Sequence, residues 1–541
     1  MSLSGLKSVY HRVLLLITLL SFFGGLHVSA QPTASTSSPT SSASPASPQS
    51  TIVISGLPSL LNLPYLNSTN PTVQLELPTT STISVTLNIC SVGINASLLP
   101  TVLLSTASPP LFSLGTRSVV DKESGGLAVP NRRNRAGDTW MVEWDAGFAN
   151  WTWSGTEVGV SMLIGIGTST GTTVGSDDGN IVVQVGITGN VPSHSLFPVA
   201  PLLGDTTSNS ALLFSPLLLS SPHSQPSYPN YTLPPNQLIL PDFPGIANLT
   251  SLSATSLLIL VPTTSSPTTD GLDNSLCAVQ SASTSTGALA DPTHMLLNAT
   301  PSWMDVGGEE GFRTLFVVGG LIAETNYTAW MVDENGGMST PICLATKEAS
   351  FPCQLVVPTS MCPSIGYAAP LPPNTTGSID YPIISLPTNI TSLISSSLLS
   401  FSTSLLSSAC GRDLYSHVSS CADCIAAYRD WLCRVVIPQC APSSPSSSTS
   451  PAAQSIFRTP SAPRNPSIIP AINYDELLPC LSVCNAVDRA CPVSLGFRCP
   501  IRGITANASY AYIGDEAGQG DGSAALGQPA LDRWGNRWCN G

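Results

Sequence analysis

The cysteines between residues 410 and 499 constrain the fold of this chain more than any other feature. Nine of the fifteen cysteines lie in this stretch, and a tenth is the third residue from the carboxyl terminus. Their dense, irregular spacing indicates a disulfide framework in an oxidising compartment, and would indicate a metal site in the cytosol. The predicted framework consists of Cys410, Cys421, Cys424, Cys433, Cys440, Cys480, Cys484, Cys491, Cys499 and Cys539.

The amino terminus indicates the secretory pathway. A short basic segment precedes an apolar run over residues 13–23, and small residues at 28–30 offer a cleavage site. This pattern predicts a signal peptide over 1–30, with an uncleaved signal anchor as the alternative. No later run approaches the roughly 18 to 20 apolar residues of a spanning helix, so nothing after the leader is expected to cross a bilayer. Secretion also favours disulfides over zinc at Cys421-x-x-Cys424.

Charge and glycosylation motifs narrow the class of partner. Only 9% of residues are charged and the formal net charge is −13, which argues against binding nucleic acid or anionic lipid. Solubility must then come largely from glycans. N-linked glycans are predicted at ten sequons, which are Asn67, Asn95, Asn150, Asn230, Asn248, Asn298, Asn326, Asn374, Asn389 and Asn507.

The middle of the chain is predicted to be antiparallel β structure. Apolar and polar residues alternate over 72–89, and further short strand patterns follow between turn clusters. We expect a Ser/Thr/Pro-rich disordered stalk at 31–52, a β-sandwich at 53–195, a Pro/Ser-rich linker at 196–250, and a second, fibronectin III-like sandwich with its connector at 251–400. In the second sandwich, Thr325-x-Tyr327 resembles a tyrosine corner. Trp140, Trp144, Trp151 and Trp153 form either a ligand platform or, more in keeping with burial tendencies, part of the core.

Five cysteines precede the dense cluster. Cys277, Cys343, Cys353 and Cys362 fall in the second predicted sandwich and suffice for two local disulfides. Cys90 is then the odd thiol, either free and buried or paired across domains.

The last part of the chain changes to a helical period. The run around Cys421 and Cys424 and the run around Cys480, Cys484 and Cys491 each place their cysteines near one helical face. We therefore expect a mainly α-helical, disulfide-rich domain at 401–541, with its helices cross-linked to each other or to flanking loops. Residues 441–472 are predicted to be a disordered insertion.

Enzyme chemistry finds no support in the motifs. Zinc-protease signatures are missing and the histidines are scattered, so no catalytic residue, metal or cofactor is predicted. The acidic loops at 177–178 and 515–521 do not have EF-hand spacing and are expected to be solvated turns.

The cysteine cluster carries a family resemblance. The sequence CGRDLYSHVSSCADCIAAYRDWLCRVVIPQC, followed by CLSVCNAVDRACPVSLGFRCP and a terminal WCN, resembles the fungal stretch-activated calcium-channel component family. It is similar, more distantly, to the frizzled-like cysteine-rich domain of animal sodium-leak-channel auxiliary subunits. The strong match covers residues 410–440 and 474–541.

The resemblance implies a role in calcium entry. Family members have been described as stretch-activated channels in their own right, but a pore needs spanning elements. We therefore expect an extracellular auxiliary subunit that reaches the membrane through a pore-forming, voltage-gated-like calcium channel subunit. Its expected location is the secretory pathway and the outer face of the plasma membrane, with the endoplasmic reticulum as a second location.

Two questions of contact and class stay open. Tyr415, Tyr428, Trp431 and Arg434 are candidate partner contacts, since aromatic residues and Arg are enriched at interface hot spots; packing around the disulfides is an equal alternative. The competing class of protein is a cell-wall or adhesion glycoprotein that binds glycan through its sandwiches.

Overall fold

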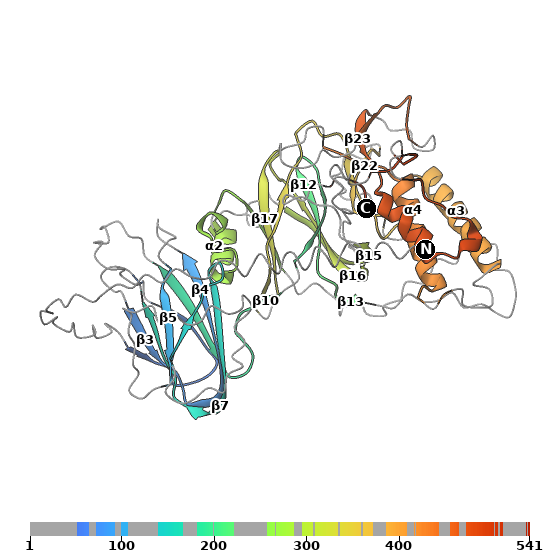
Figure 1. Ribbon diagram of the computed structural model, residues 1–541. Helices are drawn as coiled ribbons and strands as arrows, with labels where there is room; N and C mark the ends of the chain where they lie inside the picture. The colour runs from blue at the N-terminus through green and yellow to red at the C-terminus, as the bar shows by residue number, and fades with distance from the viewer. Residues whose placement is uncertain are drawn as a thin grey trace, which may run out of the picture. The chain divides into compact units, whose positions relative to one another are not determined.

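The computed structural model describes the following residues, and every structural statement below is confined to them: 51–63, 66, 72–91, 99–106, 139–165, 181–197, 200–220, 257–265, 267–285, 295–306, 309–333, 336–358, 361–371, 386–407, 416, 418–442, 455–464, 472–501, 504–506, 509–511, 537 and 539–541. These residues form a mostly β structure with several antiparallel sheets and helices α2 to α5 (Figure 1). The predicted signal peptide and most of the predicted stalk lie outside them.

Two sheets make up the first β region, residues 51–188. One has the order β1-β3-β8-β5-β6, formed by Thr51–Val53, Thr72–Glu76, Ser161–Gly165, Thr101–Ser105 and Thr139–Val142. The other has the order β2-β9-β4-β7, formed by Ser59–Asn62, Val182–Thr188, Thr80–Ser91 and Phe148–Val158. Both sheets contribute side chains to one apolar core, including Val73 and Leu75 from β3 and Val85 and Leu87 from β4.

The four tryptophans of this region pack rather than form an open platform. Trp153 is buried, and Trp140, Trp144 and Trp151 pack against the same apolar core. The rings of Trp140 and Trp151 have centroids 5.6 Å apart, and Trp144 donates its indole N–H to the Pro100 carbonyl at 2.5 Å. The core interpretation of these tryptophans therefore holds.

The second β region, residues 195–345, also has two sheets around a common core. One sheet has the order β10-β18-β17-β14, with β19 also on β17; its strands are Ser195–Phe197, Gly337–Ser339, Asn326–Val332, Leu257–Pro262 and Ile342–Ala345. The other has the order β11-β12-β16-β13, with β15 also on β16; its strands are Leu202–Thr206, Ser210–Phe214, Glu309–Gly319, Leu219–Ser220 and Met295–Val306.

Strands β11 and β12 correct the prediction of a linker at 196–250. All five residues of β12 are buried, because Ala211 and Leu213 face one core while Leu212 and Phe214 face another. A strand that is buried on both faces has no polar alternation, so the period-two pattern could not reveal it.

The predicted tyrosine corner is present. The Tyr327 hydroxyl accepts a hydrogen bond from the Ile322 backbone N–H at 3.0 Å, and the Tyr327 side chain is 1% exposed. Burial raises the pKa of this phenol. The bond ties the start of β17 to the turn that precedes it.

Helix α2, Leu276–Ser285, lies between the two β regions. Ala278 belongs to the core of the first region, while Leu276, Val279 and Ala282 pack on β14 and β17 of the second. The disulfide Cys90–Cys277 joins α2 to β4.

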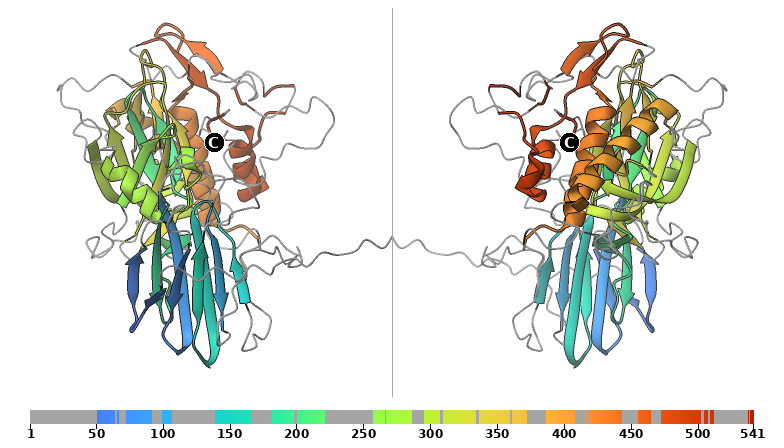
Figure 2. Two further views of the ribbon diagram at one scale, coloured as in Figure 1. Left: turned by 90° about the vertical axis from the view of Figure 1, so that its left-hand side faces the viewer. Right: turned by 90° about the vertical axis from the view of Figure 1, so that its right-hand side faces the viewer.

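The cysteine-rich region begins earlier than the predicted boundary at residue 401. Strands β20 (Gln354–Val356) and β21 (Tyr367–Ala369) share one apolar core with α3 (Thr388–Ser407) and α4 (Cys421–Val436). Figure 1 and Figure 2 show α3 and α4 side by side. Helix α4 begins with a capping box, in which Ser420 and Asp423 satisfy each other's backbone N–H.

A small sheet and a last helix complete the cysteine-rich region. Strands β22 (Gln439–Cys440), β24 (Tyr474–Leu477) and β23 (Ser455–Arg458) are paired in that order, and α5 spans Leu481–Ala490. Strand β23 lies inside 441–472, so the prediction that this whole stretch is disordered is wrong for 455–458. This strand contains the apolar pair Ile456 and Phe457. The prediction of disorder gave more weight to the Pro/Ser-rich residues on either side of the pair.

The disulfides differ from the two local bonds predicted for Cys277, Cys343, Cys353 and Cys362. Their partners lie far away in the sequence, and Cys343 is the free thiol among the described residues. Cys421 is also disulfide-bonded. The described bonds are Cys90–Cys277, Cys353–Cys440, Cys362–Cys433, Cys424–Cys491, Cys480–Cys539 and Cys484–Cys499.

Candidate functional site

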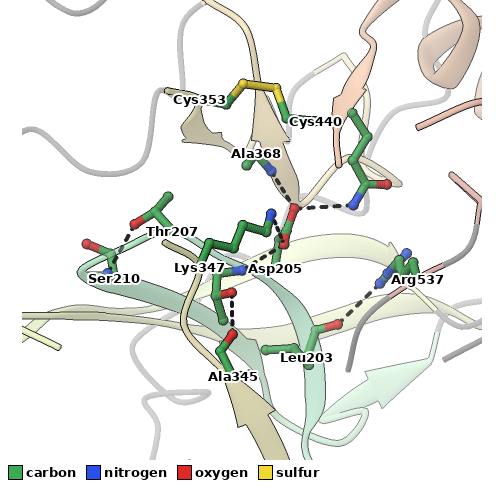
Figure 3. Close-up of polar contacts among 12 residues, drawn as sticks. Leu203, Asp205, Thr207, Ser210, Ala345, Lys347, Cys353, Ala368, Cys440 and Arg537 are labelled. Atoms are coloured by element: carbon green, nitrogen blue, oxygen red, sulfur yellow. Dashed lines mark hydrogen bonds and ion pairs between the residues drawn. A yellow bond between two sulfur atoms is a disulfide. The ribbon is translucent and has the colours of Figure 1, made fainter. Parts of the chain in front are cut away.

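A buried carboxylate joins the second β region to the cysteine-rich region. Asp205 stands at an irregularity in β11, where the pairing with β12 shifts register. One of its oxygens, Oδ1, accepts from Lys347 Nζ and the Thr206 N–H, each at 2.8 Å; the other, Oδ2, accepts from the Ala368 N–H at 2.9 Å and from Gln439 Nε2 at 3.2 Å (Figure 3). One side chain therefore holds together β11, β21, β22 and the segment after β19.

The charges at this junction depend on each other. Asp205 is 9% and Lys347 8% exposed, so each would carry a large desolvation penalty if it stood alone. Burial lowers the pKa of Lys347, and the Asp205 carboxylate partly opposes that shift. Removing one member of such a pair leaves an uncompensated buried charge.

The carboxyl terminus enters the same junction. Arg537 donates to the Leu203 carbonyl at 3.2 Å (Figure 3), and burial together with the nearby Arg434 lowers the pKa of Arg537 to about 10. Asn540 accepts from Arg434 Nη1 at 3.2 Å and donates to the Tyr367 hydroxyl at 3.1 Å. Burial raises the pKa of Tyr367, whose hydroxyl donates to the Ile437 carbonyl at 2.6 Å.

The cavity at this junction is too small for a substrate. It has a volume of about 20 Å³ and is lined by Asp205, Lys347, Gln439 and Arg537 among others. Such a space holds roughly one water molecule. The junction is therefore a structural contact between two regions rather than a reaction centre.

The structure places the predicted contact residues of α4 in internal packing. Tyr428 is half-buried, and its ring stacks on Phe401 at 3.6 Å between centroids. Trp431 donates its indole N–H to the Tyr510 hydroxyl at 2.7 Å and meets Phe497 edge-on at 5.1 Å. Tyr415 lies outside the described residues.

Arg434, the remaining candidate contact on α4, also lies in internal packing. It is 8% exposed, and its Nε donates to Asp430 at 2.6 Å. Burial by itself would lower the pKa of Arg434, but Asp430 and other acidic neighbours outweigh that effect and raise it. The guanidinium therefore has partners within the chain, as the packing alternative expects.

Three predicted glycan acceptors can be placed on the surface. Asn150, Asn326 and Asn389 are exposed in the part of the chain that the structure describes. Asn298 lies in β15. The other predicted acceptors, Asn67, Asn95, Asn230, Asn248, Asn374 and Asn507, lie outside it.

Metal and membrane signatures are sparse. Within the described ranges, no group of three His, Cys, Asp or Glu side chains could hold a metal ion. The acidic loops at 177–178 and 515–521 lie outside those ranges. One described helix, α3, is long and apolar enough to cross a membrane by length and composition, which corrects the expectation that no segment after the leader reaches this length.

The surroundings of α3 resemble those of a core helix on one face. Ile390, Ile394, Leu398 and Leu405 are buried, and the first three of them pack with α4 and β20–β21. Ser and Thr fill many of the remaining positions, so the sequence pattern showed no continuous apolar run.

Comparison with known proteins identifies the family. Residues 82–526 match the model of the Mid1 family, described as stretch-activated Ca²⁺-permeable channel components. The chain belongs to this family. It is 50% identical over 523 residues to the stretch-activated cation channel MID1 of Cryptococcus neoformans var. grubii, covering 90% of this chain and 84% of that protein.

More distant relatives match only part of the chain. The stretch-activated cation channel yam8 of Schizosaccharomyces pombe is 29% identical over 38% of this chain and 42% of its own length. MID1 of Saccharomyces cerevisiae is 30% identical over 34% of this chain and 35% of its own length. A collagenase pre-peptidase domain from Bacillus anthracis aligns over 26% of this chain and 94% of its own, with 9% identity and a TM-score of 0.16, and carries no argument.

The family relation confirms the resemblance drawn from the cysteine cluster, and it is a family of channel components rather than of enzymes. Sequence reasoning missed the Asp205–Lys347 pair. Its members are 142 residues apart and fit no motif. The one available signal was the rarity of charge, since only 9% of the residues are charged.

Proposed function

We propose that this chain is an extracellular auxiliary subunit of a plasma-membrane calcium channel, needed for stretch- or stress-activated Ca²⁺ influx. The pore would be supplied by a separate, voltage-gated-like calcium channel subunit. Membership of the channel-component family supports the calcium role, and the packing of α3 supports the auxiliary one.

The packing of α3 is the observation that carries the proposal. Among the described residues, α3 alone has the length and apolarity of a span, and its strongly apolar stripe already faces protein. In a bilayer the exposed Ser and Thr side chains would meet lipid, and a pore also needs lining elements with satisfied backbone groups. A core helix is the simpler role for α3.

The disulfides and glycan acceptors suit an extracellular location. Six described disulfides join elements that are 15 to 187 residues apart in sequence, and such bonds persist in oxidising compartments. The exposed sequons at Asn150, Asn326 and Asn389 are compatible with N-linked glycans on the same side of the membrane. We place the chain in the secretory pathway and on the outer face of the plasma membrane, with a further pool in the endoplasmic reticulum.

The domain roles follow from this placement. We propose that the frizzled-like cysteine-rich region docks on the extracellular face of the pore-forming subunit. The internal packing of Tyr428 and Trp431 would hold the docking surface in shape. The two β regions, interpreted as sandwiches, would extend away from the membrane.

The experiment is deletion of the chain in its fungal host, with Ca²⁺ uptake followed after hypo-osmotic shock. We expect uptake to fall, the full chain to restore it, and the chain expressed in cells that lack the pore-forming subunit to give no Ca²⁺ current. A current from the chain alone would contradict the auxiliary role. Normal uptake in the deletion strain would favour a wall-binding glycoprotein instead.

A further inference from the structure

A groove lies beside the disulfide Cys353–Cys440. It has a volume of about 200 Å³. Its lining combines the aromatic rings of Phe351, Phe457 and Tyr474 with the disulfide and the carboxylates of Glu348 and Asp475. This groove is ten times larger than the water-sized cavity at the Asp205 junction, on which Cys440 also borders.

Two aromatic rings of the groove are buried and one is exposed. Phe351 and Tyr474 are 8% and 4% exposed, and they belong to the same apolar core as both cysteines of the disulfide. Phe457 is 61% exposed. The exposed ring of Phe457 therefore stands beside a concave surface that contains buried aromatic side chains, the general form of a binding site.

Phe457 lies on an edge strand. Strand β23 pairs with β24 on one side, where Phe457 is opposite Asp475, and no other described strand pairs with it. The unpaired edge of such a strand is a template for an added strand, which main-chain hydrogen bonds hold while side chains enter adjacent pockets.

The groove has unpaired negative charge. Glu348 and Asp475 line it, and neither forms an ion pair with another described residue. The neighbouring cations have other partners, since Lys347 binds Asp205 while Arg458 and Arg464 both bind the fully buried Glu476. Carboxylates beside aromatic rings favour a cationic side chain, through charge-assisted hydrogen bonds and cation–π contact.

We propose that this groove receives an extended, Lys- or Arg-bearing segment of the pore-forming channel subunit, which pairs with β23 and places its cation among Glu348, Asp475 and Phe457. The proposal rests on the proposed function, because that function supplies the partner. The charge complementarity selects a basic occupant over an acidic or purely apolar one.

Co-purification of the pore-forming subunit with the full-length chain from the fungal host tests this. Two variants disable the groove, the charge-neutral pair Glu348→Gln with Asp475→Asn and the single change Phe457→Ser. The matched controls are Asp488→Asn and Val493→Ser, which change an exposed carboxylate and a 95% exposed apolar side chain away from the groove. Secretion level and protease resistance establish that each variant folds.

We expect each groove variant to lower co-purification by about tenfold and the controls to leave it unchanged. Raising the salt concentration should weaken the wild-type complex more than the complex of the charge-neutral variant. A photo-crosslinker at position 457, but not at 493, should attach to an extracellular segment of the pore-forming subunit that contains Lys or Arg.

The possible failures are distinguishable. If the wild-type chain does not bring down the pore-forming subunit, the proposed function fails and this inference with it. If it does, and the groove variants bring it down equally well, only the groove is wrong. A crosslink from position 457 to a second copy of this chain would also overturn the inference.

Discussion

The first β region and the cysteine-rich region show two ways to stabilise a low-charge extracellular chain. The first β region has one large core to which both of its sheets contribute, and its described disulfide is the bond from Cys90 to α2. The cysteine-rich region divides its apolar residues between the core that β20 and β21 share with α3 and α4 and several smaller clusters, and the other described disulfides all involve it. Where a region cannot bury enough apolar surface in one core, covalent links and buried ion pairs replace it.

This difference predicts where the chain is most easily broken. Near the cysteine-rich region, loss of a buried charge or of a disulfide should lower the stability most. In the first β region, substitutions that leave a cavity in the core should lower it most. The predictions below run from the largest expected effect to the smallest.

Replacing Asp205 should be the most destabilising of these changes. Asp205→Ala leaves Lys347 buried without its counter-ion, which should lower the free energy of unfolding by about 4 kcal/mol. The double change Asp205→Ala with Lys347→Met should recover much of that loss, because it removes both charges. Urea unfolding of the secreted chain, with Asp488→Asn as the surface control, measures both. Equal losses in the single and double variants would show that charge burial is not the cause.

A cavity in the first β region should come next. Leu87 is fully buried in the core of that region, and Leu87→Ala should cost about 3 kcal/mol. Hydrogen exchange read by mass spectrometry should place the increased opening in residues 72–188 and leave α4 and α5 protected. Equal loss of protection in α4 would mean that the two regions unfold as one cooperative unit. It would contradict the view that each region is stabilised in its own way.

Breaking the disulfide Cys90–Cys277 should have a smaller and more local effect. Each β region has its own core, so the paired change Cys90→Ser with Cys277→Ser should leave both folded. Helix α2 should become more accessible, because it loses its covalent link to β4. Limited proteolysis near 276–285 should rise while the thermal midpoint changes little, and a large fall in that midpoint would contradict this account of the bond.

The smallest effect on stability should come from a change of pH at the contact between the two β regions. His194 is 7% exposed, and its Nδ1 lies 2.7 Å from Asn88 Nδ2. The Asn88 oxygen already accepts from the Leu276 N–H, so Nδ1 must accept and therefore carries no proton. Burial lowers the pKa of His194.

The sign of the pH effect follows from that shift. A histidine whose pKa is lower in the folded chain contributes its stability fully above its unfolded pKa of about 6.5, and loses it as the pH falls towards the folded value. We expect the stability of wild type to decline more steeply than that of His194→Gln as the pH falls below about 6.5. Parallel urea midpoints for the two proteins across this range would rule out the effect.

The sequence was most informative where a period or a spacing had one meaning. Alternation at Val73, Leu75, Val85 and Leu87 predicted the core strands of the first β region, and the spacing of cysteines and aromatic residues identified the family. It was least informative where burial was two-sided or partners were distant. The apolar strand β12, the helix α3 with its scattered Ser and Thr, and the Asp205–Lys347 pair all depend on neighbours that local patterns do not contain.

The candidate groove shows the same limit. Phe457 stands in a Pro/Ser-rich stretch, Glu348 in a loop and Asp475 on a short strand, and no spacing rule links them. Only the pairing of β23 with β24 and the packing of the segment after β19 bring them together.

Glycopeptide mapping at Asn389 tests the central claim, that α3 is a core helix of an extracellular subunit. Asn389 is exposed in the first turn of α3, and a glycan there requires the helix to fold clear of the bilayer on the lumenal side. The account predicts that Asn389, Asn150 and Asn326 all carry N-linked glycans. An unmodified Asn389 beside modified Asn150 and Asn326, in protein that carbonate does not release from membranes, would contradict it and make α3 a membrane span.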